Sequence, residues 1–181
     1  MSSVDLRLLA ARVKAGDRAV FRQIVEHTRA PLFRLAARML GNMSDAEDVL
    51  QDAYVSAFRS LLEGRYDGRS KFETWMYRVV ANACIDALRR RKVRQVELPP
   101  EPQFDGAASA ETRIALSELD ALLGTLNAQD RAVVLLVLGE GLTVKEAAEA
   151  LGSTEGAVEQ RLMRSRAALR KRRDAEEASG G

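Results

Sequence analysis

The sequence of 181 residues has one cysteine, one histidine and four prolines, and these scarcities exclude several kinds of protein. The only thiol, Cys84, has no cysteine partner for an intramolecular disulfide, and its apolar neighbours predict that it is buried rather than reactive. The only histidine, His27, excludes a histidine-based metal cluster or acid–base pair, and no glycine-rich phosphate loop is present. The sequence therefore predicts a protein that is not an enzyme and that needs no cofactor or metal.

Long hydrophobic runs are also absent. No run of about eighteen apolar residues occurs, and the amino terminus lacks the charged and apolar segments of a secretory signal. These absences predict a cytoplasmic protein without membrane insertion, and the single thiol agrees with a reducing compartment. Hydrophobic residues still form 46% of the chain, which is enough for two small domains with cores of their own.

The apolar residues that are present recur at helical spacing almost everywhere, which predicts an all-α fold. One helix is expected over residues 17 to 41, with Pro31 as a kink and Gly41 as part of its carboxyl cap. The pairs Ser44/Glu47 and Ser70/Glu73 have capping-box spacing and predict the starts of the next two helices. A loop over residues 64 to 70, which holds two glycines, is expected to separate those two helices.

Three of the four prolines fall within residues 95 to 110, where no apolar period is visible, so this stretch is predicted to be a flexible linker. It divides the chain into a helical domain over residues 1 to 94 and a second domain over residues 111 to 173, followed by a disordered tail over residues 174 to 181. In the second domain, the apolar run from 133 to 138 is predicted to be a helix, because a lone strand would lack a partner.

The strongest local pattern lies in residues 141 to 173, "GLTVKEAAEALGSTEGAVEQRLMRSRAALRKRR". Thr143 and Glu146 form a third capping pair, Gly152 turns the chain, and Ser153 or Thr154 caps the next helix. Two short amphipathic helices joined by such a turn are typical of a helix-turn-helix, whose second helix enters the major groove of DNA. An ordinary helical hairpin with a basic last turn, favoured by the helix dipole, is the alternative.

The second of these helices carries the residues predicted to contact DNA. Polar side chains at its start suit base edges, and the cations that follow suit phosphates. The predicted set is Thr154, Glu155, Glu159, Gln160, Arg161, Met163, Arg164 and Arg166.

Charge is also sorted elsewhere in the chain, although the formal net charge is only +2. Five cations crowd into residues 89 to 94, which indicates either a polyanion partner or a solvated helix end. Asp45, Asp48 and Asp52 recur at i, i+3 and i+7, so they form an acidic stripe beside Gln51 on one helix. The stripe is interpreted as a docking surface for a basic partner, with dipole stabilisation or a divalent metal as the alternatives.

These segments, taken in order, resemble the two blocks of a bacterial sigma-70 family factor of the extracytoplasmic-function (ECF) group. The resemblance is carried by "SDAEDVLQDAYVSAF", "FETWMYRVVANACIDALRRRK" and "LTVKEAAEALGSTEGAVEQRLMRSRAAL", and it covers residues 17 to 169. It implies that the protein binds core RNA polymerase, recognises the minus-thirty-five and minus-ten promoter elements, and promotes DNA opening. It also implies an anti-sigma factor as a partner.

The resemblance assigns roles to residues of the first block. Asp45, Asp48, Gln51 and Asp52 are expected to bind the polymerase. The loop and the helix after it are expected to capture the melted non-template strand of the minus-ten element and to hold the adjoining duplex. The residues predicted for this role are Arg65, Tyr66, Arg69, Ser70, Lys71, Arg78, Asn82, Arg89, Arg90 and Arg91.

The chain departs from the family pattern in its recognition helix, where Ala157 replaces the usual threonine and Glu159 a common cation. Glu159 either accepts a hydrogen bond from a cytosine amino group or repels phosphate and lowers nonspecific binding. Two rival functions stay open: a stand-alone DNA-binding regulator, which would not need the acidic stripe, and an all-helical protein adaptor, which would not bind DNA.

Overall fold

The computed structural model describes residues 5–94 and 121–179, and every regular element in these two stretches is a helix, as the apolar spacing predicts. The predicted linker over residues 95 to 110 lies outside the described residues. The first stretch contains α1 (Leu6–Lys14), η1 (Arg18–Val20), α2 (Phe21–Leu40), α3 (Met43–Leu62) and α4 (Phe72–Arg94). The second contains α6 (Ala128–Val134), η2 (Leu135–Gly139), α7 (Val144–Leu151) and α8 (Glu155–Ser179).

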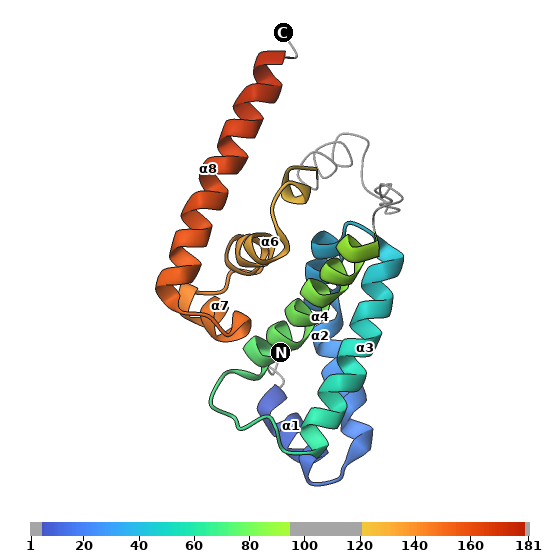
Figure 1. The fold of residues 1–181 in the computed structure, drawn as a ribbon. Coiled ribbons are helices and arrows are strands. Elements are labelled where there is room, and N and C mark those ends of the chain that lie inside the picture. The colour runs from blue at the N-terminus through green and yellow to red at the C-terminus, as the bar shows by residue number, and fades with distance from the viewer. Residues whose placement is uncertain (1–4, 95–120, 180–181) are drawn as a thin grey trace.

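In the first stretch, α2, α3 and α4 lie side by side and α1 packs at one end of them (Figure 1). Gly41 ends α2 in the left-handed region with φ of 67°, as the sequence predicts. Pro31 does not divide the helix, which continues through it. The start of α3 differs from the prediction: Asn42 is the cap and accepts a hydrogen bond from the Asp45 backbone N–H, so the helix begins before Ser44.

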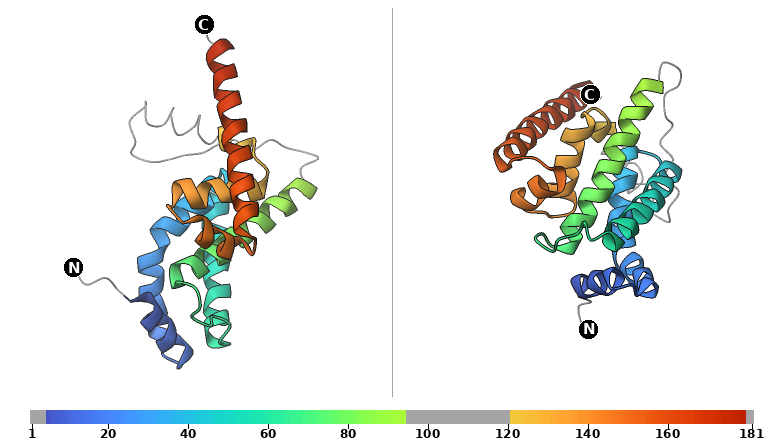
Figure 2. Two further views of the ribbon diagram at one scale, coloured as in Figure 1. Left: turned by 90° about the vertical axis from the view of Figure 1, so that its left-hand side faces the viewer. Right: turned by 60° about the horizontal axis from the view of Figure 1, so that its bottom comes forward.

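The apolar face of α4 is also rotated from the prediction. The helical spacing in the sequence predicts a buried face that includes Phe72, Trp75, Met76, Val79 and Ala83. Phe72 and Met76 are fully buried, but the face continues through Val80 and Cys84, and Val79 and Ala83 are half-buried. The difference arises because α4 packs between α2 and α3 on one side and the second stretch on the other, so both sides of the helix bury residues (Figure 2). One apolar stripe therefore does not describe the helix.

The second stretch contains the predicted helix-turn-helix. Thr143 and Glu146 form a capping box at the start of α7, Gly152 adopts a left-handed conformation, and the Thr154 hydroxyl accepts a hydrogen bond from the Ala157 N–H at the start of α8. The apolar run after Val133 is helical as predicted, and it ends as the π-helical turn η2. Helix α8 runs to Ser179, past residue 174, where the sequence predicted a disordered tail.

The two stretches pack against each other, because α6 and α7 contact α4 and η2 contacts α2. Buried residues of both stretches form one hydrophobic cluster. Helix α8 leaves this body and projects away from it (Figure 2). Among the helices of residues 5–94 and 121–179, none combines the length and apolar character that crossing a membrane requires.

Candidate nucleic-acid interface

A cleft of about 580 Å³ lies between α3 and α4 and collects several residues predicted to bind the minus-ten strand. Arg65, Arg78, Asn82 and Arg90 all line it, and Trp75 contributes an aromatic surface. Cations along a groove with an aromatic ring beside them are the combination that binds single-stranded nucleic acid, through phosphate attraction and base stacking. The structure therefore brings residues from a loop and three turns of α4 into one site of suitable chemistry.

The other cleft residues come from α3 and from α4, which adds Asp86. Ser56 and Ser60 supply hydroxyl groups, and Asp52 places a carboxylate in the same cleft as Arg90. Asp52 was assigned from the sequence to polymerase binding, so it lies at the border of the two predicted surfaces. Trp75 is held on the cleft wall by its neighbours, because its ring centroid lies 5.2 Å from that of Tyr66 and 5.5 Å from that of Phe72.

The loop before α4 is held by hydrogen bonds to one carbonyl. The Tyr66 hydroxyl donates to the Ser70 carbonyl at 2.9 Å, and the Arg7 guanidinium donates to the same oxygen at 3.2 Å. Burial of the ring, more than any neighbouring charge, raises the pKa of Tyr66. Tyr66 and Ser70 thus shape the loop, whereas Arg69 is exposed and pairs with Asp67 two residues earlier.

The basic end of α4 divides into three environments. Arg90 is exposed in the cleft, and Arg89 is exposed beside Asp86, 3.4 Å away. Arg91 is half-buried, donates to the Leu40 carbonyl at the end of α2, and lies 3.8 Å from Asp45. This arginine therefore caps a helix end as well as adding positive charge.

The acidic stripe on α3 is exposed along its whole length but borders different hollows. Gln51 lines a groove between α2 and α3, whereas Asp45 and Asp48 line a hollow with Arg90 and Arg91. Val55 lies one turn after Gln51 and is 46% exposed, which is high for a large apolar side chain. Sequence reasoning did not identify Val55, although its absence from the buried stripe of α3 marks it as a surface residue.

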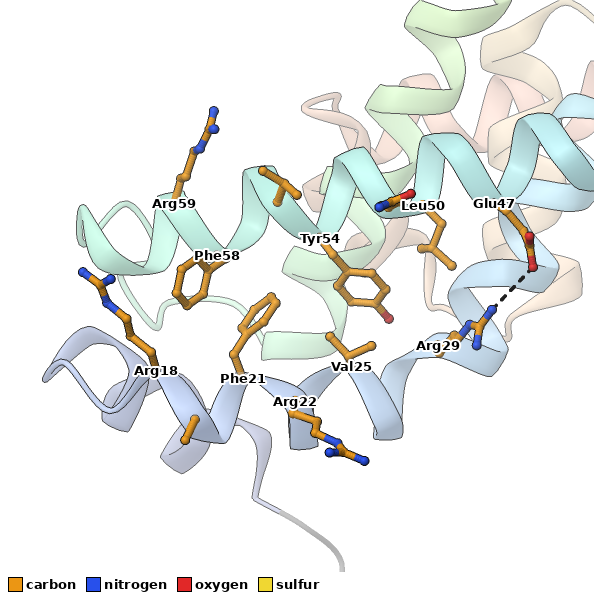
Figure 3. Close-up of a pocket in the computed structure, with 13 residues that line it drawn as sticks. Arg18, Phe21, Arg22, Val25, Arg29, Glu47, Leu50, Tyr54, Phe58 and Arg59 are labelled. Carbon is orange, nitrogen blue, oxygen red and sulfur yellow. Dashed lines mark hydrogen bonds and ion pairs between the residues drawn. The ribbon is translucent and has the colours of Figure 1, made fainter.

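The groove between α2 and α3 has a volume of about 770 Å³, and it was not predicted (Figure 3). Its floor is apolar and includes Phe21, Tyr54 and Phe58, whose rings pack on one another. Arginines surround this floor: Arg18 from η1, Arg22 and Arg29 from α2, and Arg59 from α3. The spacing of the arginines at 18, 22 and 29 is the sequence signal that marks this face.

The start of α8 presents the predicted duplex-reading surface. Glu155, Glu159, Gln160, Met163 and Arg164 are exposed, and Met163 is 67% exposed. Val158 and Leu162 are buried on the opposite side, so the helix is oriented as in the predicted helix-turn-helix. Thr154 and Arg166 are exposed at either end of this surface.

Arg161 is the member of the predicted set that turns inward. Its guanidinium is 2.7 Å from the Asp130 carboxylate, and the two side chains are 30% and 17% exposed. Asp130 also accepts a hydrogen bond from the side chain of Asn127, the cap of α6. Arg161 therefore joins α8 to α6 within the domain.

The structure also bears on the alternatives for the acidic and thiol groups: Asp45 lies in the first turn of α3, where the helix dipole stabilises a carboxylate. Within residues 5–94 and 121–179, no three side chains of histidine, cysteine, aspartate or glutamate gather in a metal-binding arrangement. Cys84 is fully buried, as predicted, and desolvation raises the pKa of its thiol to about 12, so the reactive thiolate is scarce at neutral pH.

Comparison with known proteins identifies two family regions in the chain. Residues 24–94 match the family model "Sigma-70 region 2", and residues 116–169 match "Sigma-70, region 4". The chain is 40% identical over 168 residues to the ECF RNA polymerase sigma factor SigM of Mycobacterium tuberculosis strain H37Rv, covering 91% of this chain and 82% of that protein. It is 29% identical to SigW of Bacillus subtilis strain 168, covering 88% of this chain and 92% of SigW.

A solved structure gives the same result for the fold. The structure of CnrH in complex with the cytosolic domain of CnrY superposes with a TM-score of 0.72 at 30% identity, over 93% of this chain and 97% of that one. RpoE of Bartonella quintana, solved with the anti-sigma factor NepR, shares the fold at 20% identity and a TM-score of 0.68. From the two matched regions and the identity to SigM, the chain belongs to the ECF group of sigma-70 family RNA polymerase sigma factors.

Proposed function

We propose that this sigma factor works through three surfaces that its own residues define. Helix α3 docks on core RNA polymerase, the α3–α4 cleft captures the melted non-template strand of the minus-ten element, and the start of α8 reads the minus-thirty-five duplex. Membership of the ECF group supports the role in transcription initiation. The geometry of the cleft supports the assignment of separate surfaces to strand and duplex DNA. The protein itself carries out no chemistry in this scheme, because the polymerase forms the RNA.

The observation that carries this proposal is the convergence of Arg65, Arg78, Asn82 and Arg90 on one cleft. The cations attract the phosphates of an unpaired strand, and the Asn82 amide offers both a donor and an acceptor to a base edge. Trp75 offers an aromatic surface on which a base can stack. A separated strand can bring its base edges to these groups, so we expect the cleft to bind strands that have already separated.

The start of α8 supports a different mode of recognition. Its exposed residues lie on a regular helix that stands clear of the body, which is the arrangement that enters a major groove (Figure 1). Gln160 suits the N6 and N7 edge of adenine, and Glu159 suits the amino group of cytosine. Arg164 and Arg166 follow on the same helix and suit phosphates.

The exposed surface of α3 is suited to docking on the polymerase. Asp48, Gln51 and Asp52 are exposed, and the exposed Val55 extends the same helix surface with an apolar contact. A basic helical partner would pair with the carboxylates and cover Val55, which combines charge steering with apolar burial. A stand-alone DNA-binding regulator has no need for this surface.

We also infer an anti-sigma factor as a partner, because two solved relatives, CnrH and RpoE of Bartonella quintana, are described in complexes with CnrY and with the anti-sigma factor NepR. The site of action follows from the proposed role: a protein that works with bacterial RNA polymerase acts in the cytoplasm.

Run-off transcription with core polymerase on a pool of promoter fragments tests the proposal. Asp48→Arg should abolish specific initiation, because it places a cation where a basic partner must dock. Glu26→Arg, which makes the same charge reversal at an exposed position of α2, should leave initiation intact. If the wild-type chain bound DNA but neither recruited nor redirected core polymerase, the protein would act as a stand-alone regulator instead.

A further inference from the structure

The C-terminal domain, residues 121–179, packs on the side of α4 away from α3, and it borders part of the residue set predicted to bind the minus-ten strand. Helices α6 and α7 both contact α4, and a hollow of about 440 Å³ at this junction is lined from both sides. Asn82, Asp86 and Arg89 line it from α4, and Gln129, Ser153 and Arg161 line it from the C-terminal domain. Asn82 and Arg89 are exposed, but they border the C-terminal domain across this hollow, where the proposed function has them contact nucleic acid.

Two glutamates of the C-terminal domain reach across this junction, and the first is Glu140. Its side chain is 5% exposed, and its carboxylate lies 3.2 Å from the Arg34 guanidinium of α2. The same carboxylate oxygen accepts a hydrogen bond from the Tyr77 hydroxyl of α4 at 3.1 Å. Burial, followed by the nearby Glu140 charge, raises the pKa of Tyr77, so this hydroxyl stays protonated and remains a donor.

The second is Glu146, whose carboxylate lies 2.7 Å from the Lys71 ammonium in the minus-ten loop region. The other oxygen of this carboxylate closes the capping box by accepting from the Thr143 N–H and hydroxyl. The Lys71 hydrogen bond, and then the Thr143 bonds, lower the pKa of Glu146 to about 2, so the carboxylate is charged at any physiological pH. One carboxylate thus caps the first helix of the helix-turn-helix and holds a cation predicted to bind the promoter strand.

The duplex-reading surface of α8 takes no part in this junction. Glu159, Gln160, Met163 and Arg164 do not line the junction hollow, whereas Asn82 and Arg89 line it and Lys71 pairs with Glu146. The packed arrangement therefore leaves one predicted promoter-reading surface available and occupies part of the other.

We propose that Glu140 and Glu146 form an acidic latch, which holds the C-terminal domain against α4 and must open before the minus-ten strand can bind. The proposal rests on the proposed function for the identity of the strand. The latch carboxylates bind the same kind of cationic and hydroxyl donors that phosphate oxygens bind, so a DNA strand competes with them directly. Because the fraction of open molecules limits the apparent affinity for the strand, weakening the latch tightens strand binding without adding a contact.

The latch is tested in the full-length chain with the double variant Glu140→Gln/Glu146→Gln, which keeps the size of both side chains and removes both charges. Glu149→Gln is the matched control, because Glu149 lies on α7, is exposed, and has no ion pair within the described residues. Arg34→Gln/Glu146→Gln weakens both contacts while leaving the buried Glu140 in place, so it serves if the first variant does not fold.

Opening is measured by energy transfer between dyes on cysteines introduced at Ser44 on α3 and Ala168 on α8, both of which are exposed and outside the predicted binding sets. The buried Cys84 does not compete for the labels. We expect lower transfer in the latch variant than in wild type and control. We also expect roughly three- to tenfold tighter binding of a single-stranded minus-ten oligonucleotide, with unchanged affinity for a minus-thirty-five duplex.

The outcomes separate the latch from the function on which it rests. If energy transfer and strand affinity were the same in the latch variant and the wild type, and the wild type bound both nucleic acids, the latch would be overturned. The proposed function would then still stand. Lower transfer in the latch variant without nucleic-acid binding by any form would support the latch contacts and overturn the proposed function.

Discussion

The two predicted promoter-reading surfaces of this protein differ in how they meet their surroundings. On α8 the duplex-reading side chains are exposed on a helix that stands clear of the body. On α4 the strand-binding side chains line a cleft with α3, and three of the predicted residues of this block, Lys71, Asn82 and Arg89, also meet the C-terminal domain.

This difference follows the form of DNA that each surface must bind. A duplex presents its base edges in a groove that a protruding helix can enter, so the reading surface can be exposed in advance. A melted strand must be stacked and surrounded, so its site has to be concave. Carboxylates of the chain itself also bind donors of this segment: Glu146 pairs with Lys71, and Glu140 accepts a hydrogen bond from Tyr77 of α4.

The largest expected effect comes from a cross-link that holds the C-terminal domain permanently against α4. In Lys71→Cys/Glu146→Cys, whose parent side chains touch, a bis-maleimide long enough to replace both side chains joins α7 to the loop before α4. We expect the cross-linked form to lose binding of the minus-ten strand and to keep binding of the minus-thirty-five duplex, as measured by fluorescence anisotropy. The same variant before cross-linking is the control, and equal strand binding by the two forms would show that α7 does not obstruct the cleft.

A second comparison concerns Arg161 and Arg164 of α8, for which the sequence predicted the same role in DNA contact. Arg161→Met should lower the free energy of unfolding by about 2 kcal/mol, because it leaves the mostly buried Asp130 without its charged partner. Arg164→Met should change stability by less than about 0.5 kcal/mol, and it should reduce the salt dependence of duplex binding by about one phosphate contact. Urea unfolding and salt titrations distinguish the two residues, and a reduced salt slope in Arg161→Met would return Arg161 to the DNA surface.

A substitution at Glu159 tests how the exposed surface of α8 recognises DNA. Glu159→Gln should change the preference for one base pair of the minus-thirty-five element by about 1 kcal/mol, because the side chain loses its ability to select a cytosine amino group. Sequencing of transcripts from a randomised promoter library measures this preference. If selectivity stayed the same while nonspecific binding rose, Glu159 would act by repelling phosphate.

The smallest expected effect is the acid sensitivity of the latch. The folded pKa of Glu146, about 2, lies below its ordinary value of 4.5, so its contribution to stability is complete above pH 4.5 and disappears as the pH falls toward 2. Glu146→Gln should therefore lower the melting temperature by a few degrees at pH 7, and the difference from wild type should narrow below pH 4.5. A difference that stayed constant from pH 7 to pH 3 would mean that the carboxylate charge is not what stabilises the junction.

Much of the fold could be predicted because it depends on local signals. The capping box of Thr143, the left-handed Gly152 and the cap at Thr154 all act within four residues, so the sequence placed the helix-turn-helix correctly. The same kind of signal failed at Ser44, where Asn42 offered a competing cap two residues earlier. The apolar spacing also gave the wrong buried face for α4, because a helix packed on two sides does not have a single apolar stripe.

The sequence by itself determined the helical class, the order of the two blocks and the residue types on each predicted surface, because periods, caps and motifs are properties of neighbouring residues. Only the tertiary structure decided that Arg161 turns inward, that Asp52 lies in the cleft with Arg90, and that the C-terminal domain meets α4. These features depend on pairs far apart in the chain: Lys71 and Glu146 are 75 residues apart, and Arg34 and Glu140 are 106 residues apart. The packing of whole helices determines which residues meet at such separations, and a local sequence pattern does not contain this information.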